Sequence, residues 1–104
     1  MGLIQENSGG DVTLSEDAEI RGMVPGKVYV RPNVLLQLFG IVSGGVTVEK
    51  GGRAQLRGIV LGDVMNVGGV LEVYGTVKGN IITSESGKTT IDQNAVVHGQ
   101  VKEE

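Results

Sequence analysis

The sequence repeats itself at intervals of 17 or 18 residues, and this repeat constrains the fold more strongly than any other feature. The common pattern is aliphatic-x-Gly-x-Val-x-Gly-x-Val. Full copies occupy the segments 20–28, 38–46, 56–64 and 73–81, and a shorter copy occupies 97–101. The first glycines of the copies are Gly22, Gly40, Gly58, Gly75 and Gly99, so the last interval is 24 residues. Such regularity indicates a fold assembled from near-identical units.

The spacing of aliphatic residues within each copy identifies the unit. Alternation between aliphatic and other residues favours short strands with one buried face, on which β-branched side chains pack well. Short strands joined by tight corners every 17 or 18 residues make one coil of a β-solenoid. We therefore predict an all-β, single-stranded solenoid of about five coils. Four inward-facing columns are expected: Ala18, Leu36, Ala54, Leu71 and Ala95; Ile20, Leu38, Leu56, Val73 and Val97; Val24, Val42, Val60, Val77 and Val101; and Val12, Val28, Val46, Val64 and Ile81.

Glycine accounts for 18 of the 104 residues, and half of these glycines occupy two repeated positions. The first position is the one given above, and the second comprises Gly26, Gly44, Gly62 and Gly79. We expect both to be corners, where glycine adopts a positive φ at little cost. The high glycine content then signals many tight corners and not disorder.

The repeats define one domain with short flanks. We place the solenoid at residues 10–101, an N-terminal tail at 1–9 and a C-terminal tail at 102–104. The long last interval predicts a polar loop inserted at 83–90, where the sequence is Thr-Ser-Glu-Ser-Gly-Lys-Thr-Thr. Insertions of this kind lie at one edge of a solenoid.

Composition and charge argue against several classes of function. The net charge of −3 provides no basic surface for nucleic acid. The chain has no Cys and a single His, which excludes thiolate chemistry and a multi-histidine metal site and fits a cytoplasmic location. Gly87-Lys88-Thr89 matches the end of a phosphate-binding loop, but Ile82 stands where that motif needs glycine. We expect no enzyme activity, cofactor, metal, small-molecule substrate or nucleic-acid partner.

A period of 18 is also three hexads, and aliphatic residues recur every six positions from Val24 to Val60. This spacing is similar to that of the left-handed hexapeptide helix of acyltransferases, although the hexad register ends at Asn66. An acyltransferase-like fragment, with His98 as the only histidine available as a base, stays an alternative.

The segments 46–60 and 71–81 more closely resemble the bactofilins, the polymer-forming cytoskeletal proteins of bacteria, and the resemblance extends over residues 10–101. It implies a compact, right-handed triangular β-helix and filaments that assemble through the solenoid ends without nucleotide. The family frequently carries an N-terminal membrane-attaching segment. The apolar part of this N-terminus is only Leu3-Ile4 after Met1, which argues against membrane attachment.

One candidate partner surface is lateral. The residue before the first glycine of each copy alternates between cationic and aromatic types, and the series is Arg21, Phe39, Arg57, Tyr74 and His98. If the coils stack in register, these residues form a stripe. The stripe is either a self-stabilising ladder of cation–π contacts or a surface that binds a protein partner.

The other candidate surface is the N-terminal end, because a terminal coil has unpaired backbone groups and half-covered aliphatic columns. Its contact residues would be Val12, Leu14, Ile20 and Val24, while Lys102-Glu103-Glu104 should discourage stacking at the opposite end. We favour a non-enzymatic structural protein that self-associates through its ends into a cytoskeletal polymer or scaffold. The alternative from another class is a small protein-binding module, such as a toxin-neutralising immunity protein.

Overall fold

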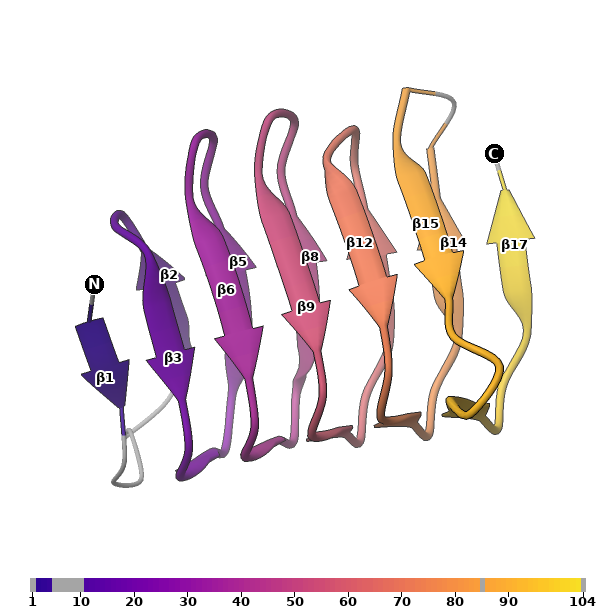
Figure 1. The fold of residues 1–104 in the computed structure, drawn as a ribbon, viewed down its shortest axis with the longest axis horizontal. Coiled ribbons are helices and arrows are strands. Elements are labelled where there is room, and N and C mark those ends of the chain that lie inside the picture. The colour runs from indigo at the N-terminus through magenta and orange to yellow at the C-terminus, as the bar shows by residue number, and fades with distance from the viewer. Residues whose placement is uncertain (1, 5–10, 85, 104) are drawn as a thin grey trace.

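The computed structural model describes residues 2–4, 11–84 and 86–103, with side chains described from residue 11 onward. In these residues the regular elements are β-strands, which form three parallel sheets along the molecule (Figure 1). Sheet A contains β1 (Gly2–Ile4), β3 (Ala18–Ile20), β6 (Leu35–Leu38), β9 (Arg53–Leu56), β12 (Val70–Val73) and β15 (Lys88–Ile91). Sheet B contains β2 (Val12–Leu14), β5 (Lys27–Val30), β8 (Gly45–Val48), β11 (Val64–Asn66), β14 (Ile81–Thr83) and β17 (Val101–Glu103). Sheet C contains β4 (Met23–Val24), β7 (Ile41–Val42), β10 (Ile59–Val60), β13 (Thr76–Val77) and β16 (Val96–Val97).

The chain passes through sheets A, C and B in turn, so that each circuit is one coil. Paired residues are one repeat apart, as with Leu36 and Ala54 in sheet A and Val42 and Val60 in sheet C. The predicted β-solenoid is therefore confirmed. In Figure 1 the front strands run downward and the back strands upward while the chain advances from left to right, which is right-handed winding. Crossovers between parallel strands nearly always have this hand.

The core consists of aliphatic columns that run along the solenoid axis. Along β9 the side chains alternate, so that Ala54 and Leu56 are buried and Gln55 faces outward. Burying one such aliphatic side chain contributes about 1.5–3 kcal/mol. Besides the predicted columns, a fifth runs through sheet B and turns polar toward the C-terminus; its members are Leu14, Val30, Val48, Asn66 and Thr83.

The last coil stacks in a different register from the predicted one. The observed pairs are Thr89 with Leu71, Ile91 with Val73, Val97 with Val77, and Val101 with Ile81. The prediction had assigned Ala95, Val97 and Val101 to the wrong columns. The reason is that Val-x-Gly-x-Val fits both halves of the repeat, and the segment 97–101 belongs to the second half.

The predicted boundaries change for the same reason. Of the polar loop expected at 83–90, residue 83 belongs to β14 and residues 88–90 belong to β15, which leaves 84–87 as the turn, with Glu85 outside the described residues. The remaining extra length lies in the corner between Ile91 and Val96. Residues 2–4 of the expected N-terminal tail form β1, which pairs with β3, and residues 102 and 103 belong to β17. Residues 1, 5–9 and 104 of the two tails lie outside the described part.

The corner glycines are required by close contact between coils, and not by positive φ as predicted. In the part of the chain that the structure describes, the glycines with positive φ are Gly45, Gly51 and Gly68. A Cβ on Gly58 would overlap the carbonyl oxygen of Gly40 one coil earlier, and a Cβ on Gly75 would overlap that of Gly58. The second glycine column is packed in the same way, and it includes Gly99, which had been assigned to the first.

Candidate functional site

Four of the five predicted stripe residues lie together at the corner between sheets A and C. The Cζ of Arg21 lies 4.7 Å from the centre of the Phe39 ring, and the Cζ of Arg57 lies 4.4 Å from that of Tyr74. Each contact is a coil-to-coil neighbour of the kind that the repeat predicts, worth about 0.5–1 kcal/mol at an exposed site. The cations and rings of the stripe are thus paired with one another.

The fifth residue, His98, lies elsewhere. The backbone amide of His98 donates to the carbonyl of Val77, which aligns His98 with Lys78 at the corner between sheets C and B. Asp92 follows Tyr74 in the stripe column, because its amide donates to the carbonyl of Val73. This displacement follows from the register of the last coil.

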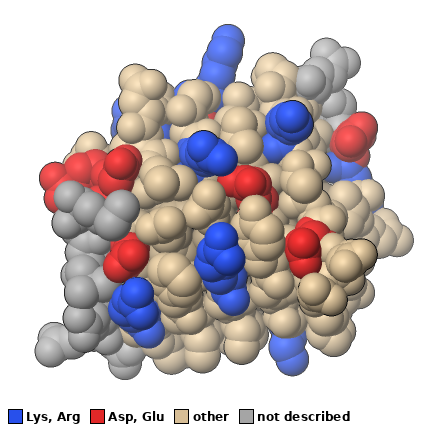
Figure 2. Space-filling model, in the orientation of Figure 1, with Lys and Arg blue, Asp and Glu red and all other residues tan. Residues whose placement is uncertain are grey.

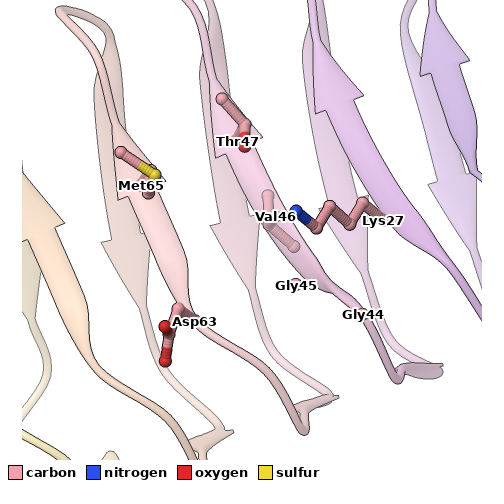
Figure 3. A pocket seen from close by; sticks show the side chains of 7 residues that line it. All are labelled: Lys27, Gly44, Gly45, Val46, Thr47, Asp63 and Met65. Carbon is pink, nitrogen blue, oxygen red and sulfur yellow. The ribbon is translucent and has the colours of Figure 1, made fainter.

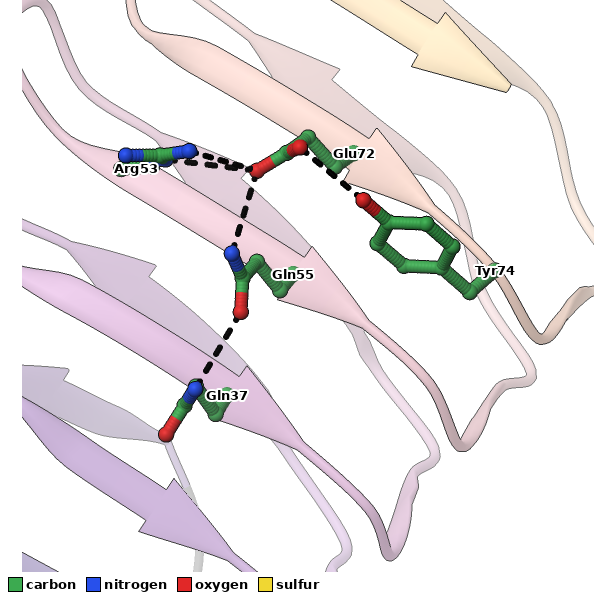
Figure 4. Close-up of polar contacts among 5 residues, drawn as sticks. All are labelled: Gln37, Arg53, Gln55, Glu72 and Tyr74. Atoms are coloured by element: carbon green, nitrogen blue, oxygen red, sulfur yellow. Dashed lines mark hydrogen bonds and ion pairs between the residues drawn. The ribbon is translucent and has the colours of Figure 1, made fainter. Parts of the chain in front are cut away.

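A ladder of polar side chains runs beside the stripe on the outer face of sheet A (Figure 4). Gln37 Nε2 donates to Gln55 Oε1 at 3.2 Å, and Gln55 Nε2 donates to Glu72 Oε1 at 3.2 Å. Arg53 forms an ion pair with the same carboxylate at 3.1 Å, and the Tyr74 hydroxyl donates to Glu72 Oε2 at 3.0 Å. This ladder was not predicted from the sequence, although its signal is the polar residue at the same position of β6, β9 and β12.

The ladder shifts two pKa values. Hydrogen bonds to the carboxylate, first that from Gln55 and then that from Tyr74, together with Arg53, lower the pKa of Glu72 against the opposing effect of burial. The bond to Glu72 raises the pKa of Tyr74, because it stabilises the neutral phenol. Both groups therefore keep their ordinary charge states near neutral pH. Figure 2 shows that cationic and anionic side chains are interspersed over this face.

The two ends of the solenoid differ in how far their aliphatic residues are covered. Three of the predicted N-terminal contact residues are core residues: Leu14 is 6% exposed, and Ile20 and Val24 are 0% exposed. The fourth, Val12, is half-buried. At the C-terminal end, Ile91 is 37% exposed and Val101 is 50% exposed. Among the described residues, the end with exposed inward-facing aliphatic side chains is thus the C-terminal one, whereas the predicted contact lay at the N-terminal end.

A small hollow lies on sheet B where β5, β8 and β11 run side by side (Figure 3). Gly45, at φ +118°, stands between Lys27 and Asp63, and the hollow that these residues line has a volume of about 150 Å³. Ligand sites usually enclose about 300–1,000 Å³. Asp63 Oδ1 already accepts the backbone N–H of Asn80 at 2.8 Å, so this oxygen is not free to bind a ligand in the hollow.

A buried polar cluster holds the last turns of sheets A and B together. Asn66 Oδ1 accepts the backbone N–H of Gly69 at 2.8 Å, and Asn66 Nδ2 donates to the carbonyl of Lys88 at 3.0 Å. The hydroxyls of Thr83 and Thr89 lie 2.6 Å apart. Lys88 and Thr89, which had suggested a phosphate-binding loop, therefore belong to strand β15 and to this cluster.

The described residues contain no helix long and apolar enough to cross a membrane. In the same ranges, no three His, Asp or Glu residues gather in a way that could hold a metal ion.

No protein-family model matches the sequence, and neither a curated protein nor a solved structure matches it.

Proposed function

We propose that the protein is a bactofilin-like structural protein that self-associates through the ends of its solenoid, with the C-terminal coil as the principal contact. The observation that supports this proposal is the exposure of Ile91 and Val101. One coil earlier, their column neighbours Val73 and Ile81 are 0% exposed, because the last coil covers them. Ile91 and Val101 have the same inward orientation, but among the described residues no further coil covers them.

The backbone supports the same proposal. β15, β16 and β17 are the outermost strands of sheets A, C and B, so each has one partner strand among the described residues. An edge strand with free N–H and C=O groups is a template for a further strand. At the opposite end β1 already covers β3 in sheet A. A second copy that stacks on the C-terminal coil would extend all three sheets and cover the exposed aliphatic residues.

The geometry also sets what kind of assembly results. A contact between two identical C-terminal ends is isologous and closes as a dimer, so a filament needs a further contact at the N-terminal end. There β4 is the outermost described strand of sheet C, and Val12 on β2 is half-buried. We expect this second contact to be the weaker of the two, because most aliphatic residues at that end are already covered.

Val101→Lys tests the contact, since it places a charge in the uncovered column without touching the inner coils. Thr90→Lys is the matched control, because Thr90 lies on the last coil and is exposed on the outer face of sheet A. Sizing at several concentrations and negative-stain microscopy should show concentration-dependent assembly of the unaltered protein and of Thr90→Lys, and a monomer for Val101→Lys. If the unaltered protein is monomeric at every concentration, the proposal is refuted.

The protein-binding module is the second candidate, and the half-exposed Phe39 in the lateral stripe supports it. It ranks second because the stripe residues are already paired with one another. Replacing Phe39 and Tyr74 by Ala should abolish capture of a partner through the stripe without unfolding the protein. The acyltransferase alternative draws no support from the right-handed coil, because the hexapeptide helix is left-handed.

A further inference from the structure

The outer face of sheet C differs in chemistry from that of sheet A. Each strand of sheet C is two residues long and turns one side chain outward. Register pairing aligns these outward residues in one column, which we call the apolar strip: Met23, Ile41, Ile59, Thr76 and Val96. Met23, Ile59 and Val96 are 38%, 36% and 48% exposed. In the sheet A ladder the corresponding outward column contains Gln37, Gln55 and Glu72.

The strip is broadest at its middle. Phe39 lies at the corner before β7 and Leu61 at the corner after β10, so these two apolar side chains stand at the two margins of the strip. They are 39% and 42% exposed. Contiguous exposed apolar residues with a polar rim mark interaction sites on soluble proteins.

Cationic residues border the strip on both sides. Arg57 stands two residues before Ile59 on the sheet A side, and Lys78 stands two residues after Thr76 on the sheet B side. Both are exposed, and the ion pairs formed within the described ranges include neither of them, while the guanidinium of Arg57 also stacks on the Tyr74 ring at 4.4 Å. The charge that complements this rim is negative on both margins, which makes an acidic partner the best match.

The spacing along the strip selects the secondary structure of that partner. The outward residues follow one another at about 4.8 Å, so the five cover about 19 Å. A helix advances 5.4 Å per turn, so over four steps its side chains drift from the strip residues by about 2.4 Å, half a step. Same-face residues of an extended strand lie about 6.7 Å apart, so they fall out of register with the strip residues after two or three steps.

We propose that the apolar strip is a docking site for an acidic amphipathic helix of a protein partner, about 13 residues long, lying along the solenoid axis. Its apolar residues at i, i+3, i+4 and i+7 contact Ile41, Ile59 and their neighbours. Carboxylates on its two flanks pair with Arg57 and Lys78. This site is lateral, and it is independent of the end contact proposed above.

The test uses a designed peptide as the probe, with Leu along one helical face and Glu on both flanks of that face. A second peptide carries Lys in place of each Glu, and a third is a scrambled version. Fluorescence anisotropy should show saturable binding of the Glu-flanked peptide alone. Ile59→Lys should weaken this binding at least about tenfold, because a central contact residue dominates an interface. Met65→Lys, at an exposed Met of the same coil on sheet B, should leave it unchanged.

Charge exchange gives a readout that damage to the fold cannot imitate. The double variant Arg57→Glu with Lys78→Glu should lose about three- to tenfold in affinity for the Glu-flanked peptide and gain affinity for the Lys-flanked one. Equal binding of the scrambled peptide, no binding of any peptide, or unchanged binding by Ile59→Lys overturns the proposal.

Two further measurements identify other occupants, and either positive result also overturns the proposal. Co-sedimentation with anionic phospholipid vesicles that Ile59→Lys abolishes, without peptide binding, would assign the strip to a membrane surface. A loss of self-association in Ile59→Lys but not in Val101→Lys would assign it to a second copy of this chain.

Discussion

Gly58 gives the sharpest test of how neighbouring coils are held together, and the perturbation is Gly58→Ala. The backbone of Gly58 has no positive φ, so a methyl group there meets no conformational barrier. At such a position, replacing Gly by Ala normally stabilises a protein by about 0.4–1 kcal/mol, because it restricts the unfolded chain. The structure predicts the opposite sign, because the added Cβ would overlap the carbonyl oxygen of Gly40.

The magnitude follows from what must move. Both clashing groups are backbone, so the overlap is relieved only by separating two coils at this corner. That separation strains the hydrogen bonds from Gly58 N–H to the Leu38 carbonyl at 2.8 Å and from Ile59 N–H to the Gly40 carbonyl at 3.0 Å. Overpacking costs about 1–3 kcal/mol, and each weakened bond about 1 kcal/mol more. We expect a loss of about 3–5 kcal/mol in the free energy of unfolding.

Urea denaturation with thermal melting is the assay, and Gly51→Ala is the matched control. A Cβ on Gly51 has room, since its nearest neighbour is 3.7 Å away, but φ is +85°. The control should lose only about 1–2 kcal/mol, from backbone strain. For a domain of this size 1 kcal/mol shifts Tm by about 4–8 °C, so Gly58→Ala should melt at least about 12 °C lower. If Gly58→Ala is as stable as the unaltered protein, or loses less than Gly51→Ala, contact between coils does not explain the glycine columns.

Two further predictions concern polar groups. Asn66→Val matches the aliphatic column of sheet B but leaves the buried N–H of Gly69 without its acceptor and removes the hydrogen bond to the Lys88 carbonyl, so it should cost about 2–4 kcal/mol in urea denaturation. Thr83→Val, which removes one hydroxyl contact, should cost about 1 kcal/mol, and equal losses would contradict the role of Asn66. The pKa of Glu72 is lowered in the folded state, so its stabilising contribution is present above its ordinary value of 4.5 and is lost as pH falls through the lower folded pKa. The difference in urea midpoint between Glu72→Gln and the unaltered protein should therefore be smallest at the acid end of a pH series. A difference that is the same at all pH values would refute this assignment.

The solenoid was predictable because its determinants are local. Alternation along segments such as 35–38 fixes which side chains face inward, and the interval of 17 or 18 residues repeats that pattern once per coil. Columns such as Val24, Val42 and Val60 follow directly from those two facts. The pairing of Arg21 with Phe39 and of Arg57 with Tyr74 was predictable too, because equal spacing places them in successive coils.

The register of the last coil was not predictable from the repeat alone. Val97-His98-Gly99 fits the first glycine position and the second equally well, and the choice depends on how β15 pairs with β12. That choice moves His98 out of the stripe. It also brings Ile91 and Val101 into the columns that end uncovered, so the candidate site at the C-terminal end depends on it.

By itself, therefore, the sequence determined an all-β solenoid and the inward faces of its inner coils, since both depend on short-range alternation and a regular period. Only the tertiary structure decided which end is open, why the corners need glycine, and that the outward residues of sheet C form one apolar strip. These properties arise between residues a whole coil apart, where the spacing of the backbones and the pairing of the strands decide which atoms meet.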